Sequence, residues 1–234
     1  MKKKIKGEMK EYTSALYGYA GNIYAKDEAV RFLTDEYFKS EFFSSKMSPA
    51  DIQQDLLNIL HDFTELHKCV VDKGDKWKHQ TTLTNSQIAK AMLSKYVIKN
   101  ISTLSENIAN DTSEQRRLGI YMGKGGNEGL YVTSEDEFRR IIRSFKYSIN
   151  DKGIQEVMNM LRDESAKCSR CENPDLIPVN NGIFDYKSKK LMAFNPEYIF
   201  LSKSRVDYNP YAKNVFIKNP DETTWDVESW MNDL

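Results

Sequence analysis

The stretch LIPVNNGIFDYKSKKLMAFNPEYIF, residues 176–200, decides the fold of the second half of the chain. Apolar residues alternate within it, and two turn signals interrupt them, Asn-Asn-Gly at 180–182 and the polar run 187–190. This pattern predicts short strands separated by tight turns, with a β-hairpin around the polar run. The expected strands are 177–179, 183–186, 191–194 and, after Pro196, a segment around Ile199, Leu201 and Val206.

A second hairpin is predicted upstream, around the glycine-rich sequence GKGGNEG at residues 123–129. This loop invites a phosphate-binding interpretation, but no Gly-Lys pair is followed by Ser or Thr in the Walker frame. The loop also joins two predicted strands, whereas phosphate loops open a helix. We therefore interpret it as a hairpin turn with Lys124 at its tip. The alternating apolar residues that flank it are Ile120, Met122, Leu130 and Val132.

Amphipathic helices are predicted in the rest of the chain. The clearest is SPADIQQDLLNILHDFTELHKCVV at residues 48–71, where Ser48 can cap the helix and Pro49 suits its first turn. Its apolar stripe consists of Ile52, Leu56, Ile59, Leu60 and Phe63. Further helices are expected at 26–43, from Thr84 or Asn85 onward with Ile88, Met92 and Tyr96 on one face, at 133–145 and at 151–167.

These elements predict an α+β fold. A helical N-terminal region precedes a small α+β domain with two β-hairpins. Gly74 and the charges around it interrupt the helical pattern, so we expect a boundary near residue 80, and a polar linker is expected at 105–117. The expected segments are 1–80, 81–218 and 219–234.

The charge pattern favours local rather than general affinity for nucleic acid. The chain has 34 basic and 34 acidic side chains, which argues against binding through the whole surface. Residues 81–150 hold ten basic and seven acidic side chains, 151–218 hold eleven and nine, and 219–234 hold five acidic ones and no basic one. An ordinary solvated surface gives similar numbers, so the charge count alone decides nothing.

Basic and aromatic side chains are interleaved in the hairpin around residues 187–190 and in the segment after it. Proteins that bind single strands use this combination, with charges along the backbone and rings under the bases. Alternation in a hairpin produces the same pattern without any ligand, so both interpretations stay open. The residues are Lys187, Lys189, Lys190, Lys203 and Arg205, near Tyr186, Tyr198 and Tyr208.

Cysteine and histidine form no complete metal motif in the sequence. Cys168 and Cys171 have the spacing of half a zinc site, and Cys69, His61 or His67 could complete it only through a long-range contact. We expect structural, reduced thiols. His61 and His67 are six residues apart and do not share a helix face, so these two and His79 are expected to be solvated or capping side chains.

Catalytic and membrane signals are also missing from the sequence. It contains neither G-x-S-x-G nor H-E-x-x-H, and its paired carboxylates lie on charged predicted helices without an apolar pocket nearby. The longest apolar runs are a handful of residues, far short of a membrane span. No apolar signal core follows the basic N-terminus. We expect a cytoplasmic protein without membrane contact.

Two stretches carry a family resemblance: GIYMGKGGNEGLYVTSEDEFRRIIRS, residues 119–144, and NPDLIPVNNGIFDYKSKKLMAFNPEYIFLSKSRVDYNP, residues 173–210. They resemble the segment that joins primase to a superfamily-three helicase in phage, plasmid and poxvirus primase–helicases. The resemblance covers about 83–212, whereas 1–80 are expected to be the helical end of a primase region or accessory helices. Leu130-Tyr131 departs mildly from the family, which often has an aromatic after the hairpin glycine. The matching residues are Leu176, Ile177, Pro178, Asn181, Gly182, Phe184, Asp185, Lys190, Leu191, Phe194, Pro196, Glu197, Tyr198, Asp207, Tyr208 and Pro210.

In that family, the ATPase begins just after this segment. TTWDVESWMNDL, with Trp225 and Trp230, looks like its first helix. The Walker residues and arginine finger are absent from this sequence, so the resemblance implies a chain cut before the ATPase that does not hydrolyse ATP. ATP and Mg²⁺ would belong to the helicase domain, and no cofactor or metal is expected here. A primase site completed by residues 1–80 is disfavoured, because they contain no D-x-D-like pair of metal-binding carboxylates.

The resemblance implies a non-catalytic DNA-replication module of a mobile element that links primase to helicase and helps guide DNA. Its expected partners are single-stranded or forked DNA, primase, helicase and further copies of itself. The alternative is a protein-interaction or oligomerisation module without DNA contact. The expected DNA-binding residues are Lys124, Arg139, Arg140, Arg143, Lys187, Lys189, Lys190, Lys203 and Arg205.

Overall fold

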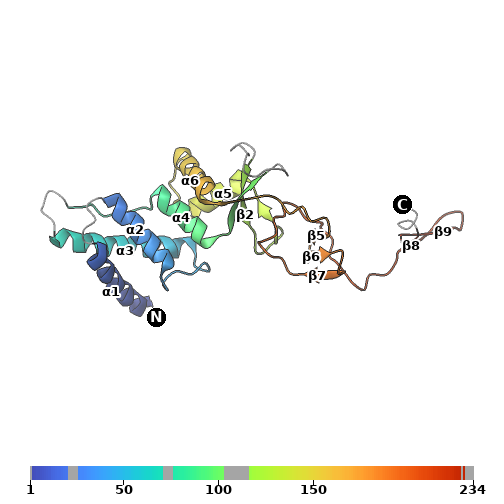
Figure 1. Ribbon diagram of the computed structural model, residues 1–234, viewed down its shortest axis with the longest axis horizontal. Coiled ribbons are helices and arrows are strands. Elements are labelled where there is room, and N and C mark those ends of the chain that lie inside the picture. The colour runs from blue at the N-terminus through green and yellow to red at the C-terminus, as the bar shows by residue number, and fades with distance from the viewer. Residues whose placement is uncertain (1, 21–25, 71–75, 103–115, 228, 230–234) are drawn as a thin grey trace. The chain divides into compact units, whose positions relative to one another are not determined.

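The structure, a computed structural model, describes residues 2–20, 26–70, 76–102, 116–227 and 229 (Figure 1). The chain divides into two compact units. The first comprises Met1–Glu172 and Asn195–Leu201, and the second comprises Asn173–Phe194 and Ser202–Leu234. Helices and small sheets together confirm the predicted α+β class.

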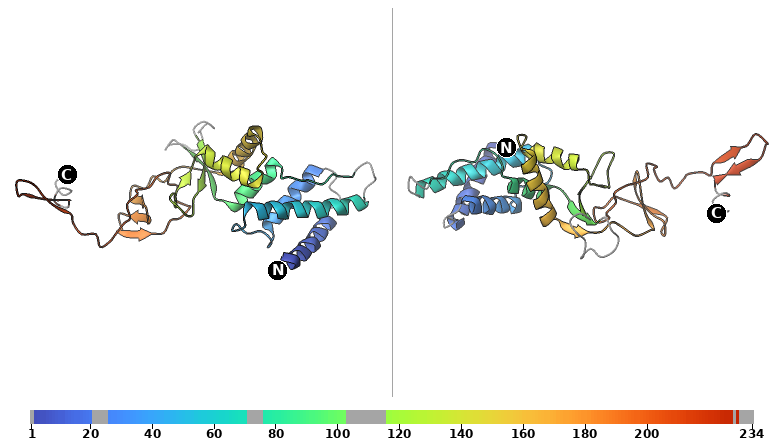
Figure 2. Two further views of the ribbon diagram at one scale, coloured as in Figure 1. Left: turned by 180° about the vertical axis from the view of Figure 1, so that it is seen from behind. Right: turned by 90° about the horizontal axis from the view of Figure 1, so that it is seen from above.

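The first unit contains the helices and a four-stranded sheet. The strand order is β3-β2-β1-β4, in which β1 pairs parallel with β4 and the other pairs are antiparallel. Helix α3 lies beside both α1 and α2 (Figures 1 and 2). The elements are α1 Lys2–Ala20, α2 Lys26–Lys39, α3 Pro49–Val70, α4 Asn85–Lys95, β1 Ile98–Ser102, β2 Arg116–Tyr121, β3 Tyr131–Val132, α5 Glu135–Phe145, α6 Asp151–Glu164 and β4 Ala166–Cys168.

Side-chain caps confirm two of the predicted helix starts, whereas Ser134 at the start of α5 forms no side-chain cap hydrogen bond. The backbone N–H of Asp51 donates to Ser48 Oγ at the start of α3, over 3.1 Å. Helix α4 begins with a reciprocal capping box, in which the Thr84 side chain and the Gln87 side chain each accept from the other residue's backbone N–H. Acidic residues fill the first turn of α5, where they stabilise the positive end of the helix dipole.

Within the described residues, one apolar core joins α1 to α6 with β1 and β2. The α3 stripe is almost fully buried, with Ile52 at 0% and Phe63 at 1% exposure. It shares this core with Met92 of α4 and Phe138 of α5. Because burying one such side chain contributes about 1.5–3 kcal/mol, α1 to α3 and the elements after residue 80 stabilise one another. The segment bounds 1–80, 81–218 and 219–234 stay a prediction.

Strand β1 was missed by the sequence prediction, which extended the helix after Asn85 through Tyr96. In the structure, Tyr96 adopts an extended backbone and its N–H donates to Met92 O, which ends α4. Ile98 then faces the helical core, while Ile101 lies in a second apolar cluster with Tyr131 and Ile199.

The hairpin predicted around residues 123–129 is confirmed, since Ile120 pairs with Val132. Of the predicted linker 105–117, residues 105–115 lie outside the described residues, and Arg116 and Arg117 belong to β2.

The second unit contains two small antiparallel sheets, ordered β5-β6-β7 and β8-β9. The predicted strand–turn–hairpin is confirmed, with the last strand beginning at Lys190 rather than Leu191. Helix formation predicted at TTWDVESWMNDL is wrong for Trp225, which lies in β9, and Trp230 is outside the described residues. The strands are β5 Leu176–Val179, β6 Gly182–Asp185, β7 Lys190–Met192, β8 Phe216–Lys218 and β9 Thr224–Asp226.

The strand predicted around Ile199, Leu201 and Val206 does not form, since residues 196–215 are all described and contain none. Ile199 and Phe200 are buried, but only isolated backbone bonds hold them. Tyr131 N–H donates to Phe200 O over 2.8 Å, and Cys171 N–H donates to Ile199 O over 3.0 Å. Of the predicted alternating residues only Ile199 is buried, whereas Leu201 is 39% exposed and Val206 is 70% exposed. The segment also lacks the continuous partner that a strand needs.

Candidate nucleic-acid interface

The β6–β7 turn is ordered by one aspartate. Asp185 accepts hydrogen bonds from the backbone N–H of Lys187 over 3.0 Å and from Ser188 Oγ over 2.7 Å. The Ser188 hydroxyl is the main reason that the pKa of the Asp185 carboxyl lies below its ordinary value. Lys189 has a φ of 55°, in the left-handed region. The turn therefore presents its lysines from a defined backbone.

Three lysines and an exposed tyrosine lie on or beside this turn, which we call the hairpin tip (residues 186–190). Lys189 Nζ lies 3.2 Å from the centroid of the Tyr186 ring. Tyr186 is 56% exposed. Lys187 Nζ forms an ion pair with Asp175 Oδ2 at 2.8 Å. Lys190 is exposed at the start of β7. The tip thus combines cationic groups with a ring, and one of its cations is partly offset by an acid.

Two asparagines of the β5–β6 turn hold the segment that carries Lys203 and Arg205. Asn180 Nδ2 donates to Asp207 Oδ1 over 2.7 Å. Asn181 uses both ends of its amide on Tyr208: Nδ2 donates to the Tyr208 carbonyl over 3.0 Å, and Oδ1 accepts from the Tyr208 N–H over 2.9 Å. Sequence reasoning assigned Asn181 only to the turn. Its second role requires a partner 27 residues away, which local patterns do not report.

The five cations of the second unit that were predicted to contact DNA do not form one cluster. Lys203 Nζ donates to the Asn180 carbonyl over 3.4 Å, so it lies at the β5–β6 turn. The hairpin tip is at the other end of β6, because a strand advances about 3.3 Å per residue. Tyr208 connects the two ends: its ring stacks on Phe184 at 4.4 Å, and its hydroxyl donates to the Lys189 carbonyl over 3.3 Å. Arg205 is exposed on the segment in between.

One face of the β5–β6–β7 sheet is apolar and half-exposed. Ile177, Phe184 and Leu191 lie opposite one another in adjacent strands, so their side chains share a face. Ile177 is 40% exposed and Leu191 is 38% exposed. Tyr208 stacks on Phe184, so this face also carries two rings between the β5–β6 turn and the hairpin tip.

In the first unit, Lys124 and Arg140 line one hollow together with Tyr96 and Tyr121. Lys124 is exposed on the β2–β3 loop, where Gly125 and Gly129 adopt φ values of 88° and 83°. The Arg140 guanidinium binds Glu137, with Nε donating to Oε2 over 3.1 Å. This contact is the main cause of the lowered pKa of Glu137. Arg140 is therefore already paired.

The other two arginines of α5 also lie beside acids. Arg139 Nη1 is 2.7 Å from Asp151 Oδ1, and its Nε donates to Glu135 Oε1 over 2.9 Å. Arg143 Nη2 is 3.9 Å from the same Asp151 oxygen. Carboxylates thus offset the cationic face of α5, and the hairpin tip is the better-exposed positive site.

The structure separates other residues that the sequence pattern grouped. Tyr198 belongs to the first unit, where its ring lies 6.3 Å from that of Phe200. The lysines with which the sequence pattern grouped it at 187–190 belong to the second unit.

Burial raises the pKa of the Cys168 thiol, which disfavours its thiolate form. Among the described residues, neither Cys168 nor Cys171 belongs to a group of three potential metal ligands. No described helix is both long and apolar enough to cross a bilayer.

Comparison with protein families identifies a match over most of the chain. The family described as D5 N terminal like matches residues 58–233. The match starts inside α3 and reaches past β9, so it is wider than the resemblance seen in the sequence motifs. No curated protein matches the chain.

Proposed function

Since the chain belongs to the D5 N terminal like family, the N-terminal region of phage, plasmid and poxvirus primase–helicases, we propose that it links primase to helicase and guides DNA. Family membership makes it a replication-associated primase–helicase module. The proposal adds a non-catalytic role: the chain contributes positive charge and rings along the path of a strand, and ATP hydrolysis belongs to a helicase domain.

The observation that carries the DNA-guiding role is the hairpin tip. Lys187, Lys189 and Lys190 extend from a turn that Asp185 orders, and Tyr186 is exposed beside them. Ammonium groups can neutralise phosphates while the phenol ring stacks on a base. In the absence of DNA, the Lys189 ammonium lies over the Tyr186 ring. On binding, the ammonium would move to a phosphate, and a base would stack on the ring in its place.

Contacts of this kind favour binding without sequence preference. Lysine side chains act as point charges on phosphates, and phosphate contacts position a protein without reading bases. If Lys187, Lys189, Lys190, Lys203 and Arg205 each neutralise one phosphate of a single strand, the logarithm of the binding constant falls with the logarithm of salt concentration with a slope of about −3.5.

Fluorescence anisotropy with labelled single-stranded, forked and duplex DNA tests the proposal. The test variant reverses the charge of the tip, with Lys187, Lys189 and Lys190 all changed to Glu. The control variant changes Lys46, Lys76 and Lys152 to Glu. These lysines are also exposed but lie in the first unit, so both variants change net charge equally.

We expect the tip variant to bind DNA at least tenfold more weakly and with a shallower salt slope, by about 2 for three lost contacts to a single strand. The control variant should bind like the unchanged protein, apart from a small general charge effect. Equal loss in both variants would remove the tip from the proposal. Absence of binding at low salt would remove the DNA-guiding role altogether.

A second function, docking of a protein partner without DNA contact, is favoured by the β8–β9 ribbon. Phe216 is 67% exposed, Ile217 is 48% exposed and Trp225 is 36% exposed. Side chains of these types are costly to leave in water and dominate protein interfaces. This function predicts stable oligomers or a primase–helicase complex that Phe216→Ser disrupts, with no change in DNA affinity. Light scattering and co-purification with the helicase measure this outcome.

A further inference from the structure

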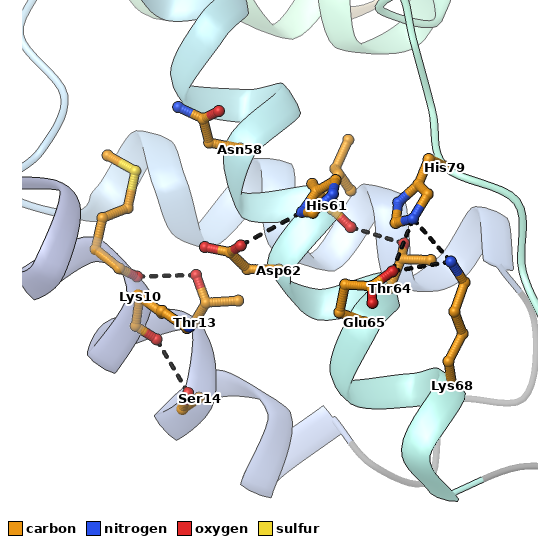
Figure 3. A network of polar contacts seen from close by, with 12 residues as sticks. Lys10, Thr13, Ser14, Asn58, His61, Asp62, Thr64, Glu65, Lys68 and His79 are labelled. Atoms are coloured by element: carbon orange, nitrogen blue, oxygen red, sulfur yellow. Dashed lines mark hydrogen bonds and ion pairs between the residues drawn. The ribbon is translucent and has the colours of Figure 1, made fainter.

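Two histidines and a glutamate meet on the surface of α3, away from the hairpin tip. His61 and Glu65 are four residues apart on this helix, so their side chains share one face. His79 approaches them from the segment after the helix (Figure 3). The potential ligand atoms of the three side chains all lie within 4.8 Å of one another.

Each of the two histidines has one ring nitrogen beside a carboxylate. His61 Nδ1 lies 3.5 Å from Asp62 Oδ1, which leaves Nε2 of His61 available. His79 directs its Nε2 to Glu65 Oε1, 2.7 Å away. The two imidazoles stack at 4.3 Å with an angle of 13° between their planes. Asp62 thus provides the carboxylate that commonly orients a metal-binding histidine.

Lys68 shows that this place already accommodates a positive charge. Its Nζ lies 2.7 Å from His79 Nε2 and 2.9 Å from Glu65 Oε1 (Figure 3). His79 Nε2 cannot accept a proton from Lys68 and donate one to Glu65 at the same time, so one of these contacts lacks a shared hydrogen. A cation bound by both lone pairs would satisfy the nitrogen and the carboxylate together.

The position of His79 is defined by its neighbours in the chain. Trp77 stacks on the buried His67 of α3 at 3.8 Å. Gln80 Nε2 donates to Gln87 Oε1 over 2.6 Å, at the start of α4. His79 Nδ1 is buried and has no hydrogen-bond partner within the described ranges. The ring is therefore held beside α3 by contacts on both sides, and its Nε2 is the atom that faces the other ligands.

We propose that His61, Glu65 and His79 bind a divalent transition-metal ion of the Zn²⁺ class. Imidazole nitrogen and carboxylate oxygen are ligands that Zn²⁺ accepts, and three protein ligands leave a fourth position for water. Tetrahedral bonds of about 2.0–2.1 Å place ligand atoms about 3.3 Å apart. Because the two rings are stacked, one of them must turn out of the stack so that both ring planes contain the ion, and the exposed His61 side chain is the one with room to turn. The ion displaces the Lys68 ammonium. A bound metal ion would link the segment that carries His79 to helix α3, which carries His61 and Glu65.

This site was not predicted from the sequence. The six-residue spacing of His61 and His67 argued against a shared face, but the four-residue spacing of His61 and Glu65 allows one. The third ligand becomes visible only in the fold, because 13 residues separate Glu65 from His79. The proposal replaces the expectation that this chain binds no metal.

Isothermal titration calorimetry of the full chain with Zn²⁺ tests the proposal. We expect one bound ion per chain and a rise in Tm that EDTA reverses. His61→Ala and His79→Ala should each weaken binding more than about 100-fold, beyond the 10- to 100-fold that loss of an outer-shell partner costs. The His61 side chain is 57% exposed, so its removal tests the site without disturbing the core.

Two control variants distinguish this site from Zn²⁺ binding elsewhere on the chain. Lys68→Gln removes the competing ammonium and should bind Zn²⁺ at least as tightly as the unchanged chain. A Cys69→Ser, Cys168→Ser, Cys171→Ser variant should also keep its affinity, and bound Co²⁺ should show no thiolate charge-transfer band. Failure of the unchanged chain to bind, unchanged affinity in the histidine variants, or loss of binding in the cysteine variant would each overturn the proposal.

Discussion

Replacement of Gly182 by alanine should open the hairpin that carries the tip. Gly182 has a φ of 155°, which L side chains rarely adopt, and an added Cβ would lie 2.4 Å from the Met192 carbonyl oxygen. Backbone strain of this kind costs about 1–3 kcal/mol, and overpacking against a fixed neighbour costs a similar amount. The combined effect is at least about 2 kcal/mol, which raises the open population of the hairpin roughly 30-fold.

Amide hydrogen exchange measures this opening. In the Gly182→Ala variant, amides of residues 183–192 should exchange at least about 30-fold faster, because β6 and β7 can no longer approach. Amides of α3 should be unaffected, since α3 belongs to the other compact unit. The matched control is Gly126→Ala, where an added Cβ meets nothing within 4 Å and the φ is not in the restricted range.

Unchanged exchange at 183–192 in the Gly182→Ala variant would refute this reasoning. It would mean that the strands tolerate a side chain at the turn, so the close approach of Met192 does not require glycine. Equal acceleration in the Gly126→Ala control would show a general effect of alanine substitution instead. DNA affinity should fall in the Gly182 variant if the proposed role of the tip is correct.

Three further predictions concern other parts of the chain. Leu56→Ala should destabilise the first unit by about 2–5 kcal/mol and lower the thermal transition of α3 and α6 together, as measured by calorimetry and exchange, because both helices share one core. Asn181→Ala removes two hydrogen bonds to Tyr208, worth about 0.5–1.5 kcal/mol each, so exchange of the Tyr208 amide should accelerate while that of β2 does not. Burial raises the pKa of Asp55, so its contribution to stability is present at low pH and is lost as pH rises through the raised value. Asp55→Asn should therefore increase Tm at pH 7, and the gain should vanish below about pH 4; a gain independent of pH would contradict a cause in the Asp55 charge.

Local patterns predicted much of the fold. The stripe of α3, the cap at Thr84 and the acidic first turn of α5 each act within a few residues, and each appears in the structure as expected. Both hairpins were also predicted, because a turn and two adjacent strands form a local unit. The nine lysines and arginines named as expected DNA-binding residues stay predictions. The structure shows which of them lie beside a carboxylate.

Elements that depend on distant partners were not predicted. Strand β1 is recognisable only through β2 and β4, and β4 begins at Ala166, more than sixty residues after β1 ends. The segment around Ile199 alternates like a strand, but tertiary contacts bury only Ile199 and Phe200 and give the segment no ladder. The clamp of Asn181 on Tyr208 has the same origin.

The sequence by itself determined where most helices and both hairpins lie in the chain, and which of their faces are apolar. These features follow from backbone preferences and from the periods of 3.6 and 2 residues, which neighbouring residues set among themselves. Only the tertiary structure decided that residues before and after 80 share one core, that acids accompany the arginines of α5, and that His79 meets His61 and Glu65. Each of these features depends on how side chains far apart in the chain pack together. The hydrophobic effect has no direction, so the spacing of apolar residues along the sequence does not specify which distant residues they will contact.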